Sequence, residues 1–101
     1  MRTRLELQQA FEDILGTRNV YFEPPATIRM NYPAIVYERS KIRSDYAGNR
    51  RYKTERVYDA VLIGRDPDSA FLEPLLELPY CSYDRHYVQD NLHHDAFTIY
   101  L

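Results

Sequence analysis

Several residue types that signal particular protein classes are rare or missing in this sequence. It contains no tryptophan, one cysteine, Cys81, and three widely separated glycines. One cysteine cannot form an intrachain disulfide, and isolated glycines do not make a phosphate-binding loop. The chain also has no apolar run long enough to span a membrane, and its first residues lack the uninterrupted apolar stretch of a signal peptide. We therefore expect a soluble protein made in a reducing cytoplasm, with Cys81 as a small buried side chain.

The residues that are present describe a globular chain. Its 101 residues are 45% apolar and 14% aromatic, and ten of them are tyrosines. This length predicts a single domain, 1–101, whose core is small enough that oligomerisation commonly adds to its stability. Tyrosine is favoured both at protein interfaces and on β-strands, so its abundance fits either use.

The charge is unevenly distributed. Residues 39–56, RSKIRSDYAGNRRYKTER, carry seven Lys/Arg against Asp45 and Glu55, a net charge of +5. Because the whole chain has a net charge of −2, the rest must carry −7. One basic segment is thus attached to an acidic body.

The first element expected is an amphipathic helix. Thr3 and Glu6 have the spacing of a capping box, and Gly16 stands where such a helix would end. Between them lies one apolar stripe, made of Leu7, Phe11, Ile14 and Leu15. A single stripe predicts that this helix packs against another layer.

The rest of the chain favours β-strands with one further helix. Strands are expected at Val20–Phe22, from Ala34 to Glu38, from Tyr52 to Gly64 and from Ala96 to Leu101. A turn at AGN makes residues 39–56 a projecting β-hairpin, called the basic hairpin below. A second helix is expected between Asp68 and Leu78, kinked by Pro74 or beginning there. The expected fold is α+β in the order α-β-β-β-α-β, with a mostly antiparallel sheet and two helices packed against it.

The segment YDRHYVQDNLHHDAF contains all three histidines of the chain. A metal site could draw its ligands from Asp84, His86, His94 and Asp95. His93 and His94 are adjacent, so on a strand they point to opposite faces and at most one joins His86. The alternative is a polar loop from Tyr83 to Asp95 whose side chains bond to the backbone. We favour the loop, and so expect no metal site.

No catalytic pattern is recognisable. Ser82, Asp84 and His86 could form a triad in principle, but no GxSxG motif surrounds a serine. Cys81 and His86 could form a nucleophile pair, but the apolar neighbours of Cys81 argue against a reactive thiolate. We expect no enzyme, no cofactor and no catalytic residue.

The basic hairpin interleaves its cations with tyrosines, as nucleic-acid surfaces do. The acidic charge of the whole domain disfavours attraction to a polyanion. Two other interpretations are an arm that docks on an acidic protein surface and a solvated hairpin whose charges protect a sheet edge. Docking on protein is the interpretation that we favour.

The phrases RNVYFEPP, YPAIVYE, DPDS and LLELPYCSYDRHYVQDNLHHDAFTIYL, in this order, resemble a family of small head–tail junction proteins of long-tailed bacteriophages. These are tail terminator or tail-completion proteins, and the resemblance covers most of residues 10–101. It implies a structural virion protein at the head–tail junction, assembled in the host cytoplasm. A head-completion or stopper protein of the neck would also fit the resemblance, and a small nucleic-acid-binding domain is a more distant alternative.

The resemblance implies a six-membered ring that caps the tail tube, stops its growth and joins it to the head. The implied partners are further copies of this chain, the tail tube protein and the head-completion or connector protein. DNA would pass through the lumen without specific binding, and no membrane is involved. On this basis the basic hairpin becomes a contacting arm. We expect interface residues at Arg43, Tyr46, Arg50, Arg51, Tyr52, Lys53, Tyr83 and His86.

Overall fold

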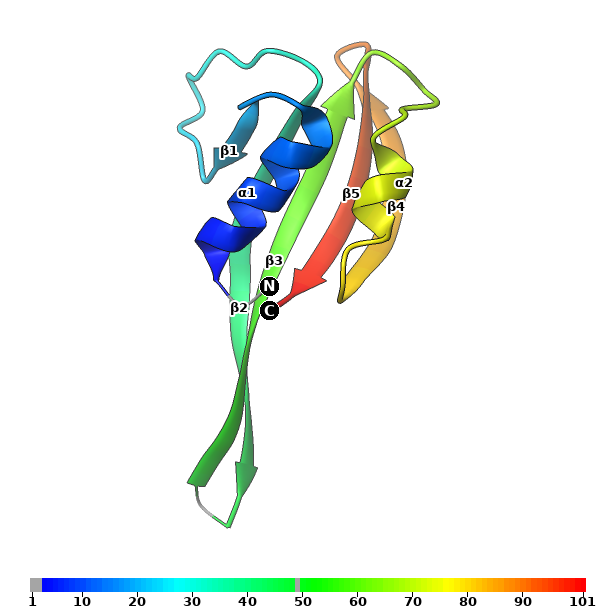
Figure 1. Ribbon diagram of the computed structural model, residues 1–101. Helices are drawn as coiled ribbons and strands as arrows, with labels where there is room; N and C mark the ends of the chain where they lie inside the picture. Colours follow the sequence, from blue (N-terminus) through cyan, green and yellow to red (C-terminus); the bar gives the residue numbers. More distant parts are fainter. Residues whose placement is uncertain (1–2, 49) are drawn as a thin grey trace.

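The computed structural model describes residues 3–48 and 50–101, with side chains except at 45–47 and 51–53. Two helices lie on one face of a five-stranded sheet (Figure 1). The elements are α1 (Arg4–Leu15), β1 (Val20–Phe22), β2 (Ala34–Ala47), β3 (Arg50–Gly64), α2 (Leu72–Leu76), β4 (Cys81–Gln89) and β5 (Leu92–Tyr100). The strand order is β1-β2-β3-β5-β4, in which β1 and β2 are parallel and the other pairs antiparallel. The α+β class is thus confirmed.

Helix α1 forms where its capping residues and apolar stripe predict it. The Glu6 N–H donates to Thr3 Oγ1 at 3.2 Å, and Gly16 closes the helix in the left-handed conformation with φ of 70°. Leu7, Phe11 and Leu15 are buried, and Ile14 is partly buried against the same core. The stripe docks α1 onto the sheet.

The core lies between the helices and the sheet. The strands contribute side chains that alternate along β2, β3 and β5, because every second residue of a strand points to the same face. Phe11 of α1 meets the Tyr37 and Phe97 rings edge-on, with centroid distances of 5.3 and 6.0 Å. The buried members on the sheet side are Val20, Ile35, Tyr37, Tyr58, Ala60, Leu62, Phe97 and Ile99.

Tyr37 brings a hydroxyl group into this cluster of aromatic rings. Its hydroxyl donates to Gln8 Oε1 and accepts from Arg4 Nη1 at 3.2 Å, so it ties β2 to α1. Burial raises the pKa of Tyr37 above its ordinary value of 10.0, although the nearby Arg4 acts in the opposite direction. The folded chain therefore holds this proton more tightly than the unfolded chain does.

The linkage predicts an alkaline loss of stability. The Tyr37 contribution is complete below about pH 10, the unfolded pKa, and is lost as the pH rises through the raised pKa of the folded state. Tyr37→Phe should cost about 1 kcal/mol at neutral pH through its lost hydrogen bonds. Above pH 10, the stability of the Tyr37→Phe variant should also decline less than that of the wild type. Urea denaturation from pH 7 to 11 checks both expectations, and parallel stability curves for the two proteins would contradict the linkage.

The second helix is shorter than expected. It covers Leu72–Leu76, with Pro74 as its third residue. Proline is tolerated there because the first backbone N–H groups of a helix have no partner within the helix. Leu75 is fully buried in the core cluster. The sequence predicted either a kink at Pro74 or a helix that begins there. Instead, the helix begins at Leu72, two residues before Pro74.

The predicted element order was wrong at the end of the chain. The order is α-β-β-β-α-β-β, because the segment expected as a polar loop from Tyr83 to Asp95 forms β4, a two-residue turn and the start of β5. The turn residues Asp90 and Asn91 adopt φ of 55° and 61°, which these short polar side chains tolerate. Strand β4 is at the edge of the sheet and mostly exposed, so its sequence lacks the alternation of a half-buried strand. The parallel β1–β2 pair was also not anticipated.

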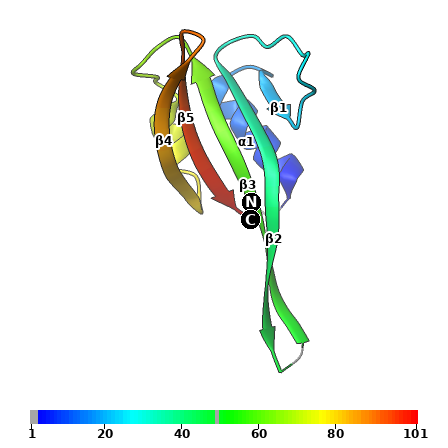
Figure 2. The same cartoon turned by 180° about the vertical axis from the view of Figure 1, so that it is seen from behind.

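Strands β2 and β3 continue well beyond the other strands as a two-stranded hairpin, which projects from the body (Figure 1). The molecule is correspondingly elongated, with extents of 51 × 29 × 24 Å. Seen from behind, the face of the sheet opposite the helices has no helix over it (Figure 2). The structure therefore offers two surfaces for partners, namely the hairpin and the uncovered face.

Candidate protein-interaction surface

The basic hairpin is built by continuous antiparallel pairing. The pairs run from Arg39 with Tyr58 to Ala47 with Arg50, with register shifts between Arg39 and Lys41 and between Asp45 and Tyr46. Bulges of this kind increase the local twist of a strand pair. The tip is thus held away from the body by backbone hydrogen bonds.

The described cations of the hairpin remain largely available for a partner. Lys41 and Arg50 are exposed. Arg43 Nη1 lies 3.7 Å from Glu55 Oε2, which is the one ion pair within the described part of the chain. An exposed pair of this kind contributes little to stability, so Arg43 can exchange it for another carboxylate. The side chains of the other expected contact residues, Tyr46, Arg51, Tyr52 and Lys53, lie outside the described residues.

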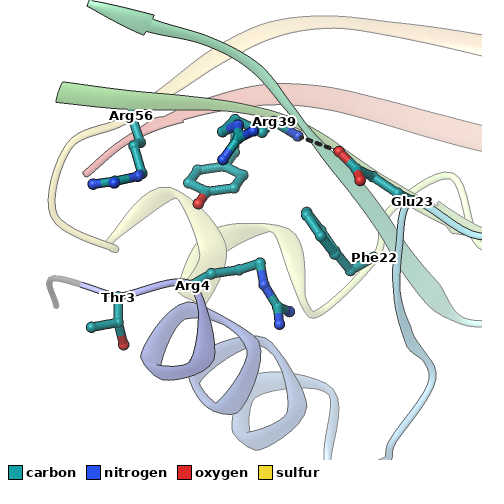
Figure 3. A pocket seen from close by; sticks show the side chains of 7 residues that line it. Thr3, Arg4, Phe22, Glu23, Arg39 and Arg56 are labelled. Atoms are coloured by element: carbon teal, nitrogen blue, oxygen red, sulfur yellow. Dashed lines mark hydrogen bonds between the residues drawn. The ribbon is translucent and has the colours of Figure 1, made fainter.

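A second cationic feature lies where the hairpin leaves the body (Figure 3). It is a cleft of about 470 Å³ between the start of α1, the end of β1 and the strands β2 and β3. The lining residues are Thr3, Arg4, Phe22, Glu23, Arg39, Arg56 and Tyr58. Three arginines against one glutamate make this cleft electropositive, so it extends the positive surface of the basic hairpin onto the body.

The side chains of the cleft are partly fixed in place. The Arg4 guanidinium lies 4.4 Å from the centroid of the Phe22 ring and also donates to Tyr37. Glu23 Oε1 accepts from the Arg39 backbone N–H at 3.3 Å, a contact drawn in Figure 3. Neither Arg4 nor Phe22 was predicted from the sequence to line a site, because only the register of β1 and the packing of α1 bring them together.

Tyr83 and His86 do not join the basic hairpin. They lie on β4, which is separated from β2 by β3 and β5. Tyr83 is 42% exposed, and its hydroxyl donates to Oδ1 of the buried Asp95 at 2.8 Å. Desolvation raises the pKa of Tyr83, and the Asp95 carboxylate raises it further. Six of the eight expected contact residues thus belong to the hairpin strands, and the other two to β4.

The three histidines are not arranged as in the metal site that was weighed against a polar loop. His86 Nε2 and His93 Nδ1 share a hydrogen bond of 3.2 Å with stacked rings, while His94 stacks on Tyr87 at 4.7 Å. His93 and His94 thus point to opposite faces, as adjacency on a strand predicts. Across residues 3–48 and 50–101, no three His, Cys, Asp or Glu side chains are placed to hold a metal ion.

The catalytic combinations considered from the sequence are not assembled among these residues. Ser82 pairs with Thr98 and His86 pairs with Asp95, so the bulge between Tyr83 and Arg85 places Ser82 and His86 on opposite faces. Asp84 accepts from the Thr98 hydroxyl at 2.8 Å and does not orient a histidine.

Cys81 is half-buried and packs against the core cluster. Desolvation by burial raises the pKa of its thiol, and Asp84 raises it further. Both effects disfavour the thiolate that a nucleophile needs. This placement agrees with the expected packing role of Cys81.

A scan against models of known protein families and a search of curated proteins found no match to this chain. No helix in the described ranges is long and apolar enough to cross a bilayer. The function proposed below is therefore argued from the charge and geometry of the basic hairpin and the acidic body, together with the resemblance of the sequence.

Proposed function

We propose that this chain is a structural protein of a long-tailed bacteriophage, namely a tail terminator. Copies of the chain form a ring, taken to be hexameric, on the end of the finished tail tube. The ring stops tube growth and presents a surface to the head-completion or connector protein. The observation that carries the proposal is the combination of a projecting hairpin of charge +5 with a body of charge −7.

A ring needs two different surfaces that complement each other. In a head-to-tail interface each subunit uses one patch to contact the preceding copy and another to contact the next, and closure of the rotation gives a ring. The basic hairpin and the acidic body provide two such patches on one chain. A 101-residue domain also gains stability from burying further surface between copies.

The proposal also requires the ring to attach to the tail tube and to the head. The hairpin extends beyond the body along the 51 Å axis, so it can reach a layer above or below a ring of bodies. DNA would pass through the lumen without sequence-specific contacts. The ring would be localised at the head–tail junction of the virion.

The proposal is tested by disrupting the gene in a phage that carries it and examining the lysate by electron microscopy. Tails should be abnormally long or unattached, next to filled heads without tails. Expression of the wild-type chain from a plasmid should restore tails of uniform length. Normal particles from the disrupted phage would refute the proposal.

A further inference from the structure

The uncovered face of the sheet contains a groove with an apolar floor and an acidic rim. The groove is about 280 Å³ in volume, and its apolar part is contributed mainly by Pro24, Val36 and Val61. Its charged side chains are Glu23, Glu38 and Asp59, and its remaining lining residue is Tyr37. No lysine or arginine is among the described residues that line this groove.

The two carboxylates at the centre of this rim face each other. Glu38 on β2 is the direct register partner of Asp59 on β3, and both side chains are exposed. Neither has a hydrogen bond or an ion pair with any residue that the structure describes. Like charges in directly opposed positions of an antiparallel pair destabilise the sheet. A cation supplied by another molecule would remove this repulsion.

The acidic row continues across the sheet. Asp59 is paired with Thr98 on β5, and the Thr98 hydroxyl donates to Asp84 on β4. Three strands therefore present carboxylates along one line of the uncovered face, next to the apolar row formed by Val36 and Val61. This surface, which we call the acidic groove, suits a side chain with an aliphatic stem and a cationic head.

The basic hairpin supplies side chains of this chemistry. Lys41 and Arg50 are exposed, and Ile42, 48% exposed, stands between Lys41 and Arg43 in the sequence. The hairpin thus combines cations with an apolar contact, which matches the apolar floor and acidic rim of the groove. It cannot reach the groove of its own chain, because β2 and β3 run straight from the groove into the hairpin and away from the body (Figure 2).

From this complementarity we propose that the acidic groove is the docking site for the basic hairpin of a second copy of this chain. The contact is head-to-tail, because each copy offers a hairpin on one side and a groove on the other. This inference rests on the proposed ring function and specifies the surfaces that would form the ring. It assigns roles in binding to Glu38 and Asp59, which the sequence alone did not single out.

The test uses two charge-reversed variants of the full chain. The hairpin variant is Lys41→Glu with Arg50→Glu, and the groove variant is Glu38→Lys with Asp59→Lys. Association is measured by sedimentation at the highest soluble concentration in low-salt buffer. The wild type should associate, and each variant alone should associate more weakly by more than about tenfold, because like charges then meet at the contact.

Restoring complementarity should restore association. An equimolar mixture of the two variants should assemble. The acidic hairpin of the first variant fits the basic groove of the second, and the basic hairpin of the second fits the acidic groove of the first. A single chain with all four substitutions should self-associate for the same reason. The control Glu73→Lys with Glu77→Lys changes the charge equally on exposed residues around α2 and should behave as the wild type.

Three outcomes would overturn the docking proposal. They are a wild type that stays monomeric, variants that associate like the wild type, and variants that are not rescued by mixing. None of them bears on whether the chain is present in virions, so the interface and the phage function can fail separately. Circular dichroism of each variant shows that loss of association is not loss of folding.

Discussion

Reversing the two arginines that follow the hairpin turn is expected to abolish tail capping while leaving the domain folded. In Arg50→Glu with Arg51→Glu, four charge units change at the hairpin tip, outside the core. Surface substitutions usually alter stability by less than about 0.5 kcal/mol, so the melting temperature should stay within a few degrees. Opposed like charges at a contact cost several kcal/mol, and a ring repeats the loss at every subunit. Tail length in micrographs and plaque counts measure the defect.

A matched control separates the position of the charge from its amount. Arg18 and Arg29 are exposed on the body, away from the hairpin. Arg18→Glu with Arg29→Glu makes the same change in net charge and should support normal tails. If the hairpin variant also gave infectious particles with tails of normal length, the basic hairpin would be a solvated feature and the interface would have to be sought elsewhere.

Removing the ring of Phe11 is expected to have the largest effect on stability. The side chain is fully buried and joins α1 to the sheet through its edge-on contacts with Tyr37 and Phe97. Phe11→Ala should lower the free energy of unfolding by about 3–5 kcal/mol, because it removes apolar contacts and leaves a cavity. Domains of this size are stable by only about 5–15 kcal/mol, so the variant should be close to unfolding at 37 °C.

Leu5 provides the control on the same helix. Its side chain is 69% exposed, so Leu5→Ala should change the free energy of unfolding by less than about 0.5 kcal/mol. Urea denaturation of both variants measures the difference. Equal losses of stability for Leu5→Ala and Phe11→Ala would contradict the packing of α1 through its Leu7–Phe11–Leu15 stripe.

The helix α1 could be predicted from the sequence because its signals are local. The Thr3 cap, the stripe and Gly16 all lie within fourteen consecutive positions, 3–16, and each acts on its nearest neighbours. The hairpin strands were also recognisable, since β-formers lie on both sides of a short turn. The start of β2 at Ala34 was also predicted, but the strand runs to Ala47, well beyond the expected end at Glu38.

The edge strand β4 was not predictable by the same means. Most of its side chains are exposed, so it does not need alternating apolar residues, and its polar sequence resembles a loop. The signal that could have revealed it is the Asp90-Asn91 pair, which favours a two-residue hairpin turn. Without this turn, the sequence did not show that Tyr83 and His86 lie on an edge strand, which β3 and β5 separate from β2.

The acidic groove depends on information that no local pattern contains. Glu38 and Asp59 become neighbours only through the register of β2 with β3, and the same register pairs Val36 with Val61 two positions along, on the same face. The sequence did reveal that the body is acidic and the hairpin basic, because net charge needs no register. It could not show where on the body the carboxylates gather.

The central claim is that this chain forms a ring at the head–tail junction of a phage, and its most direct test is the location of the chain in purified virions. Immunogold labelling with an antibody to the chain, combined with quantitative mass spectrometry of the same particles, gives its position and copy number. If the chain forms this ring, the label should be confined to the head–tail junction, and the copy number should correspond to one ring per particle. Absence of the chain from virions, or a single copy per particle, would contradict it.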